Sequence, residues 1–90
     1  MKPDETLKTA ASLVSGDRAE QYGDYTIMHQ RAADLWSAYL KVEVKPEDVA
    51  LCMALLKVAR NEMGQVKPDN GIDASAYMAL WAAMMEDKDA

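Results

Sequence analysis

The stretch Val44–Gly64, VKPEDVALCMALLKVARNEMG, decides the fold because it carries both ends of a helix and an apolar middle. Pro46 suits the first turn of a helix, and the two acids behind it suit the positive end of the helix dipole. Gly64 stands where a left-handed residue commonly closes a helix. Residues 49–56 are apolar all round, which is typical of a helix with neighbours on several sides. We therefore predict a central helix over about 46–63.

Similar signals predict three further helices, over about 4–14, 26–40 and 72–85. Proline and acidic residues mark the start of the first helix, and the turn-rich stretch QVKPDNG precedes the last one. No window shows the period-two alternation of a strand. The sequence thus predicts an all-α fold, a four-helix bundle-like single domain over 1–90 with roughly antiparallel helices joined by short loops.

Helical spacing also predicts which side chains are buried. In the second helix the expected buried stripe is Ala32, Leu35, Trp36, Tyr39 and Leu40. In the fourth helix, one face is expected to carry Asp73, Tyr77, Leu80, Trp81 and Met84. We expect both tryptophans to anchor the core or a subunit interface. Cys52 lies within an apolar run and is expected to be a small buried residue.

The composition points to association between copies of the chain. Half of the 90 residues are apolar, a large share for a chain of this length, which buries about 60–65% of its unfolded surface. Part of this apolar surface is expected to be covered by a partner, so we predict a homo-oligomer.

The charge excludes several classes of partner. The net charge is −5, and the basic residues are scattered rather than clustered. Duplex nucleic acid and anionic membranes are therefore not expected as partners.

A single cysteine permits no disulfide within the chain, and the N-terminal stretch has no apolar signal core. We therefore expect a protein of a reducing cytoplasm.

Two cations follow the apolar run of the central helix. Lys57 and Arg60 lie one turn apart. Their apolar stems can cover the core while the charged groups reach water, or they can pair with acids such as Asp73. Alternatively, they form a cationic pair for a phosphate or carboxylate, with arginine as the planar fork and lysine as the point charge.

The connection GDRAEQYGDYTIMH, residues 16–29, is unusually rich in functional side chains. We consider Arg18, Tyr22, Asp24 and His29 as ligand contacts, beside a glycine that permits a sharp bend. The arginine can meet a phosphate and the tyrosine can stack on a base. Each residue also has a structural interpretation. The arginine can bond within the loop, the tyrosine can cover the core edge, Asp24 can cap the helix, and His29 can be a surface or hydrogen-bonding residue.

A third candidate group opens the last helix. Asp69, Asp73 and Tyr77 are spaced four apart and share one face if the helix includes all of them. Two carboxylates so placed can hold Mg²⁺, which would be the cofactor. The simpler interpretation is that Asp69 or Asn70 caps the helix and Asp73 lies in its first turn.

The blocks DRAEQYGDYTIMH, AADLWSAYL, EDVALCMALLKVARNEMG and DNGIDASAYMAL resemble an uncharacterised family of small helical proteins encoded by bacteriophages and prophages. The resemblance covers about residues 17–80. It implies phage origin, an all-helical domain and a location in the cytoplasm of the bacterial host.

The chain is also distantly similar to the MazG-like nucleotide pyrophosphohydrolases, helical and usually oligomeric enzymes that cleave nucleoside triphosphates with magnesium. This likeness implies that Tyr22-Gly23, Lys57, Arg60 and residues 69–73 form a nucleotide site. The family's metal cage normally combines Glu-x-x-Glu on one helix with Glu-x-x-Asp on the next, a pattern that this chain lacks. The missing pattern implies either a degenerate site that binds a nucleotide without cleaving it, or a likeness of architecture alone.

These observations leave three hypotheses for function. The first is a phage nucleotide-handling protein, as a MazG-like pyrophosphohydrolase or a degenerate nucleotide-binding relative. The second is a module that sequesters a nucleotide without chemistry. The third is a helical module that binds a phage or host protein through its apolar surplus. No catalytic residue is assigned by the sequence.

Overall fold

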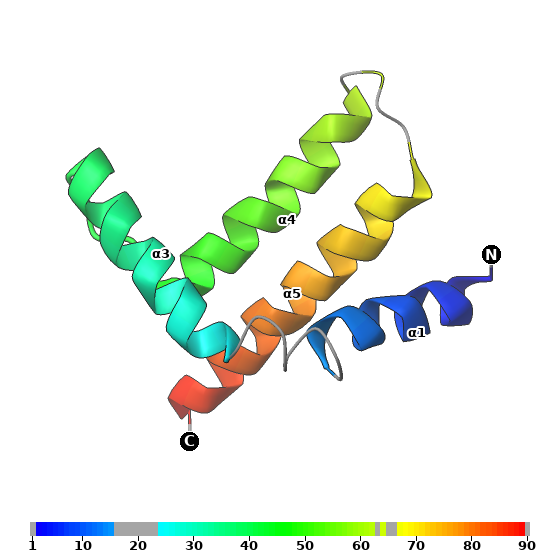
Figure 1. Cartoon of the computed structure of the whole chain (residues 1–90), viewed down its shortest axis with the longest axis horizontal. Helices are drawn as coiled ribbons and strands as arrows, with labels where there is room; N and C mark the ends of the chain where they lie inside the picture. The colour runs from blue at the N-terminus through cyan, green and yellow to red at the C-terminus, as the bar shows by residue number, and fades with distance from the viewer. Residues whose placement is uncertain (1, 16–23, 63, 65–66, 90) are drawn as a thin grey trace.

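The protein is all-α, as predicted. A computed structural model describes residues 2–15, 24–62, 64 and 67–89. These residues form α1 (Pro3–Val14), α3 (Tyr25–Leu40), α4 (Pro46–Glu62) and α5 (Pro68–Asp89) (Figure 1). The last helix starts four residues before the predicted position and extends four residues beyond it.

The ends of the helices follow local chemistry. Proline occupies the first turn of α1, and α4 and α5 also begin at proline. At the start of α4, the Asp48 carboxylate accepts a hydrogen bond from the Lys45 amide at 3.0 Å, as in a capping box. Gly64 has a φ of 77°, so the predicted left-handed position after this helix is confirmed.

Helices α4 and α5 form an antiparallel pair at the centre of the molecule. Three polar contacts join them: Glu47–Lys88, Lys57–Asp73 and Asn61–Asn70. The residue numbers rise along α4 while those of the partners fall along α5, as an antiparallel pair requires. Helix α1 packs against α5, and α3 packs against α4 (Figure 1).

This arrangement corrects the prediction that α4 is surrounded by neighbours. Its inner side is buried at Val49, Ala50 and Ala54, but Leu55 and Leu56 are more than half exposed. Cys52 is also exposed, in contrast to its expected burial. Figure 1 shows the reason, because α3 diverges from α4 and leaves the far end of α4 without a helix on that side.

The buried face of α3 also differs from the predicted stripe. His29 and Ala33 are its buried residues, whereas Leu35 is 71% exposed and Tyr39 is 86% exposed. The sequence pattern identified an amphipathic helix correctly but placed its inner face partly wrongly, since Leu40 is also exposed whereas Ala32 and Trp36 are partly buried. The small Ala33 side chain faces the interior because it permits close contact.

The core of the described residues is small. Its buried apolar members are mostly alanines, together with Val49, Ile72 and Met84. One cluster joins Ala10 of α1 to Ile72 and Ala76 of α5, with Leu13 and Val14 packed against it. Trp36 and Trp81 are each partly buried. Within the described ranges, no helix combines the length and the apolar character needed to cross a bilayer.

Candidate functional site

An ion pair between the two central helices forms the middle of the candidate site. Lys57 Nζ of α4 lies 3.3 Å from Asp73 Oδ2 of α5. The Lys57 side chain is 16% exposed and that of Asp73 is 34% exposed, so the lysine is held against the protein while the carboxylate reaches solvent. The pairing is one of the structural alternatives considered for this lysine, and it fixes the position of the ammonium group.

This ion pair borders a cavity of about 290 Å³ between three helices. The lining residues are Leu13 and Val14 of α1, Lys57 of α4, and Asp73, Ala76, Tyr77 and Leu80 of α5. The expected common face of Asp73, Tyr77 and Leu80 is therefore present. The cavity combines a cation, an anion and a phenol with apolar side chains, so it offers both polar partners and an apolar contact to a small molecule.

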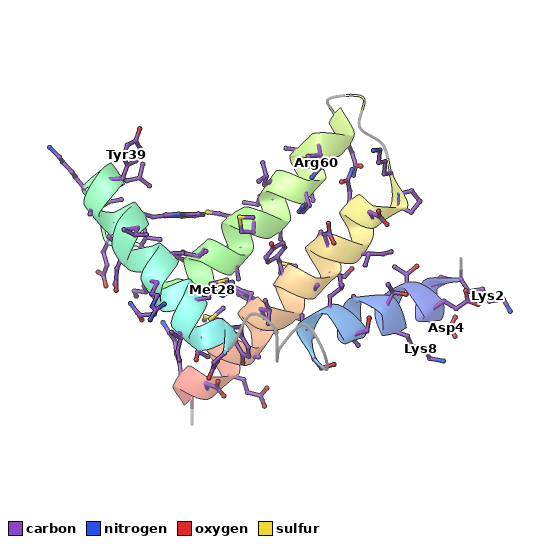
Figure 2. The ribbon with its side chains drawn as sticks, in the orientation of Figure 1. Lys2, Asp4, Lys8, Met28, Tyr39 and Arg60 are labelled. Atoms are coloured by element: carbon purple, nitrogen blue, oxygen red, sulfur yellow. The ribbon has the colours of Figure 1, made fainter. Side chains whose placement is uncertain are left out.

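The remaining residues of the two predicted helical groups lie apart from this cavity. Arg60 is exposed near the end of α4 (Figure 2) and is not among the lining residues. Asp69 is exposed in the first turn of α5, where the helix dipole favours an acid. Among the described residues, no three His, Cys, Asp or Glu side chains lie together as a metal site. The Asp69–Asp73 magnesium site remains a prediction.

Asp24 acts as the N-cap of α3. Its Oδ1 accepts hydrogen bonds from the Thr26 amide at 2.8 Å and from the Thr26 hydroxyl at 2.7 Å. The hydroxyl bond and then the amide bond stabilise the charged form and lower the pKa of Asp24 below 3.8. The structure thus supports the capping interpretation of this residue.

His29 lies one turn further into α3 and is buried. Its Nδ1 lies 2.8 Å from the backbone oxygen of Tyr25, and since a carbonyl only accepts, Nδ1 carries the hydrogen. The two rings also meet edge to face, with centroids 6.4 Å apart. Neither Asp24 nor His29 lines the Lys57 cavity. Arg18 and Tyr22 lie outside the described residues.

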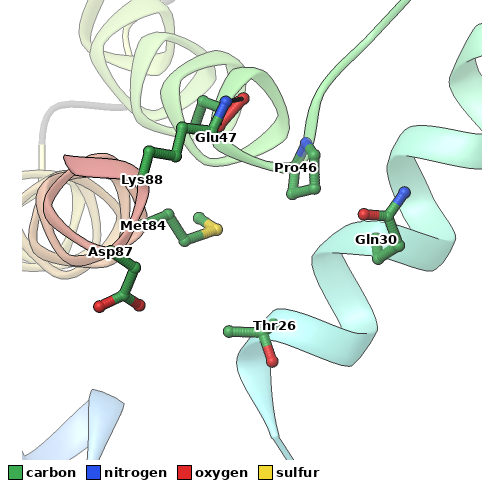
Figure 3. Close-up of a pocket in the computed structure, with 7 residues that line it drawn as sticks. All are labelled: Thr26, Gln30, Pro46, Glu47, Met84, Asp87 and Lys88. Carbon is green, nitrogen blue, oxygen red and sulfur yellow. Dashed lines mark hydrogen bonds and ion pairs between the residues drawn. The ribbon is translucent and has the colours of Figure 1, made fainter. Parts of the chain in front are cut away.

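A second cavity, of about 300 Å³, lies between α3, the N-terminal end of α4 and the C-terminal end of α5. Figure 3 shows Thr26 and Gln30 of α3 on one side, and Glu47 and Lys88 on the other. The buried Glu47 accepts from Lys88 Nζ at 2.7 Å through Oε1, and its Oε2 lies 2.6 Å from the same nitrogen.

The sequence interpretation missed this contact. It assigned Glu47 to the helix dipole and ended the last helix at about residue 85, before Lys88. The two residues are 41 positions apart, so no local spacing connects them. The sequence does place an acid at the start of one helix and a lysine at the end of a later helix. These two residues predict an ion pair only once the helices are known to be antiparallel.

These features define a small all-α domain built on an antiparallel helix pair, with cavities where α1 and α3 meet that pair. The chain belongs to the family described as a domain of unknown function, DUF6378, whose model matches residues 5–85.

Relatives of this chain occur in mycobacteriophages. The Gene 55 protein of Mycobacterium phage L5 is 40% identical over 84 residues, covering 92% of this chain and 54% of the relative. The Gene 55 protein of Mycobacterium phage D29 is 34% identical over 71 residues, covering 79% of this chain and 47% of the relative. The chain thus spans about half the length of these relatives. The expected likeness to phage proteins is confirmed. No solved structure matches.

Proposed function

We propose that this chain is a nucleotide-binding domain of a phage protein, and that the Lys57 cavity receives the phosphate end of the nucleotide. The observation that supports this is the meeting of Lys57, Asp73 and Tyr77 from two helices at one cavity. Its volume of about 290 Å³ is near the lower end of small-molecule sites, about 300–1,000 Å³. Such a cavity suits a phosphate group with part of a nucleoside better than a whole dinucleotide.

The lysine is suited to the phosphate because its ammonium group is mostly shielded from water. A phosphate oxygen that enters the cavity can take the place of Asp73 as the acceptor for Lys57, because both are charged acceptors that form charge-assisted bonds with an ammonium group. Tyr77 offers a hydroxyl for a second bond or a ring for base stacking.

The Asp73 carboxylate would repel a phosphate unless a cation stands between them. Mg²⁺ is commonly held by one or two protein carboxylates together with substrate phosphates, and the part-exposed Asp73 fits that mode. In that case the metal neutralises the repulsion, and Lys57 becomes free to bind the phosphate. We therefore propose that binding is stronger with magnesium.

The proposal is limited to binding at this site. The distant MazG-like similarity implies magnesium-dependent pyrophosphate cleavage, in which several carboxylates hold the metal. The described residues bring a single carboxylate, that of Asp73, to the cavity. A hydrolytic form would need further carboxylates beside Asp73 at this cavity, and the relatives are about twice as long as the matched region.

The test is a thermal-shift panel of nucleoside triphosphates and inorganic triphosphate, with and without magnesium. A ligand at a hundred times its Kd stabilises the folded state by about 2.7 kcal/mol, which is readily detected. We expect at least one nucleotide to raise the Tm and Lys57→Met to abolish that shift. Lys8→Met on the exposed side of α1 is the matched control and should leave the shift unchanged (Figure 2).

A second variant separates the two roles of Asp73. Asp73→Asn removes the competing charge, so binding without magnesium should rise while the increment due to magnesium disappears. Silence of the wild type across the panel would overturn the proposal. A shift that Lys57→Met leaves intact would place the nucleotide elsewhere on the molecule.

A further inference from the structure

We propose that a second copy of this chain docks on the α3–α4 hairpin, residues 25–62. The docking surface, called the hairpin surface below, consists of exposed large apolar side chains: Ile27, Met28, Leu35, Tyr39, Leu40, Val42, Leu55, Leu56 and Val58. Elsewhere in the described residues, the exposed large apolar side chains are Leu7, Met78 and Met85. The apolar surplus is therefore concentrated on one structural unit.

The chain exposes more surface than a folded monomer of its mass normally does. It exposes 6595 Å², whereas a folded monomer of 10.0 kDa should expose about 5,200 Å². The difference of roughly 1,400 Å² exceeds the ~800 Å² that each partner buries in a standard interface. The surplus is therefore large enough to accommodate a dimer contact of standard size.

The hairpin surface contains the large apolar side chains that the core lacks. Within the described residues the buried apolar set is dominated by alanines, which contribute little burial energy. Met28, Leu35 and Tyr39 are spaced by seven and four residues, so they project from the same side of α3. Tyr39 is 86% exposed and lies at the far end of that helix (Figure 2).

The distribution of charge favours a second copy as the partner. The hairpin has five basic residues, Arg31, Lys41, Lys45, Lys57 and Arg60, and five acidic ones, Asp34, Glu43, Glu47, Asp48 and Glu62. Its formal charge is therefore zero, and the net charge of −5 resides outside it. Two hairpins can meet in a symmetric contact without net repulsion, with the acidic remainder of each chain held away from the interface.

The test measures molar mass by sedimentation equilibrium across a wide range of concentration. We expect twice the 10.0 kDa of the chain. Leu35→Glu and Leu55→Glu place a charge on each helix of the hairpin and should weaken the dimer at least tenfold. Leu7→Glu is the matched control, because Leu7 is 63% exposed on α1, outside the hairpin. It should leave the molar mass unchanged.

A second measurement on the wild type guards against variants that fail to fold. The Tm of a dimer rises with protein concentration, whereas the Tm of a monomer does not. A monomeric mass with a constant Tm would overturn the proposal and assign the hairpin surface to another partner. Equal weakening by Leu7→Glu and by the hairpin variants would overturn it as well. Neither readout involves nucleotide.

Discussion

Helices α5 and α3 are held in place by different kinds of polar contact. The side chains of α5 reach across to α4 at three levels, over 41, 16 and 9 residues of sequence. Those of α3 bond within the helix or to the turn that follows it, and among the described residues the longest such contact joins Ser37 to Val44, seven residues away. Polar contacts therefore hold α5 to α4, whereas the polar contacts of α3 are local to that helix and its ends.

This difference explains the distribution of function that we propose. The helix pair with long-range contacts provides a stable wall for a ligand cavity, because rigid elements hold site residues in place. Helix α3 has few anchors, and its large apolar side chains point outward. A docked second copy would supply the tertiary packing that α3 lacks within one chain.

The largest expected contrast is between burial on α5 and exposure on α3. Ile72→Ala removes a buried side chain packed between α1 and α5, and should lower the free energy of unfolding by about 2–4 kcal/mol. Leu35→Ala on α3 should change it by less than about 0.5 kcal/mol in dilute protein. Denaturant titration monitored by circular dichroism measures both values.

Ile72→Val provides a milder variant if the alanine variant is unfolded, with an expected loss of about 0.5–1.5 kcal/mol. Comparable losses at Ile72 and Leu35 in the dilute protein would show that α3 is buried as deeply as α5. The contrast between the two helices would then be wrong.

A smaller effect is expected from the ion pair at the end of α5. Lys88→Met leaves the buried Glu47 carboxylate without its cation, which should cost about 1–2 kcal/mol because the lysine itself is 47% exposed. Replacing both residues, as in Glu47→Leu with Lys88→Met, should cost less than the lysine change alone. A double-mutant cycle from denaturant titrations measures the coupling, and additive losses would mean that the pair does not interact.

The sequence predicts the helices well because their signals are local. Prolines at the starts of α1 and α4, the Asp24 cap and Gly64 all act within a few residues, and each is found as expected. Pro68 differs, because the sequence predicts a turn there and the residue begins α5 instead. The common face of Asp73 and Tyr77 also follows from spacing within one helix.

The inner face of a helix is harder to predict because it depends on which neighbour is present. The apolar residues of α3 and α4 exceed what one small chain can cover, so the pattern shows that these helices are amphipathic or apolar without showing which residues are inside. Leu35 and Cys52 were assigned to the interior for that reason. The candidate site is only partly predictable for the same reason. Lys57 meets Asp73 across two helices, and the sequence does not specify that these helices are paired.

The smallest expected effect concerns the local cap of α3 and its dependence on pH. The pKa of Asp24 is lowered in the folded protein because Thr26 donates two hydrogen bonds to the carboxylate. The cap therefore stabilises the protein at pH values above 3.8, the ordinary pKa, and this contribution is lost as the pH falls through the lower pKa of the folded protein.

Two variants of Asp24 test this prediction. Asp24→Asn keeps an oxygen acceptor and should remove this pH dependence, while Asp24→Ala should weaken the start of α3 at neutral pH. Carboxyl carbon chemical shifts, followed by NMR from neutral to acidic pH, measure the pKa directly. A pKa of Asp24 at or above 3.8 in the folded protein would show that the cap does not stabilise the start of α3. The claim that α3 is held by local contacts, unlike α5, would then be wrong.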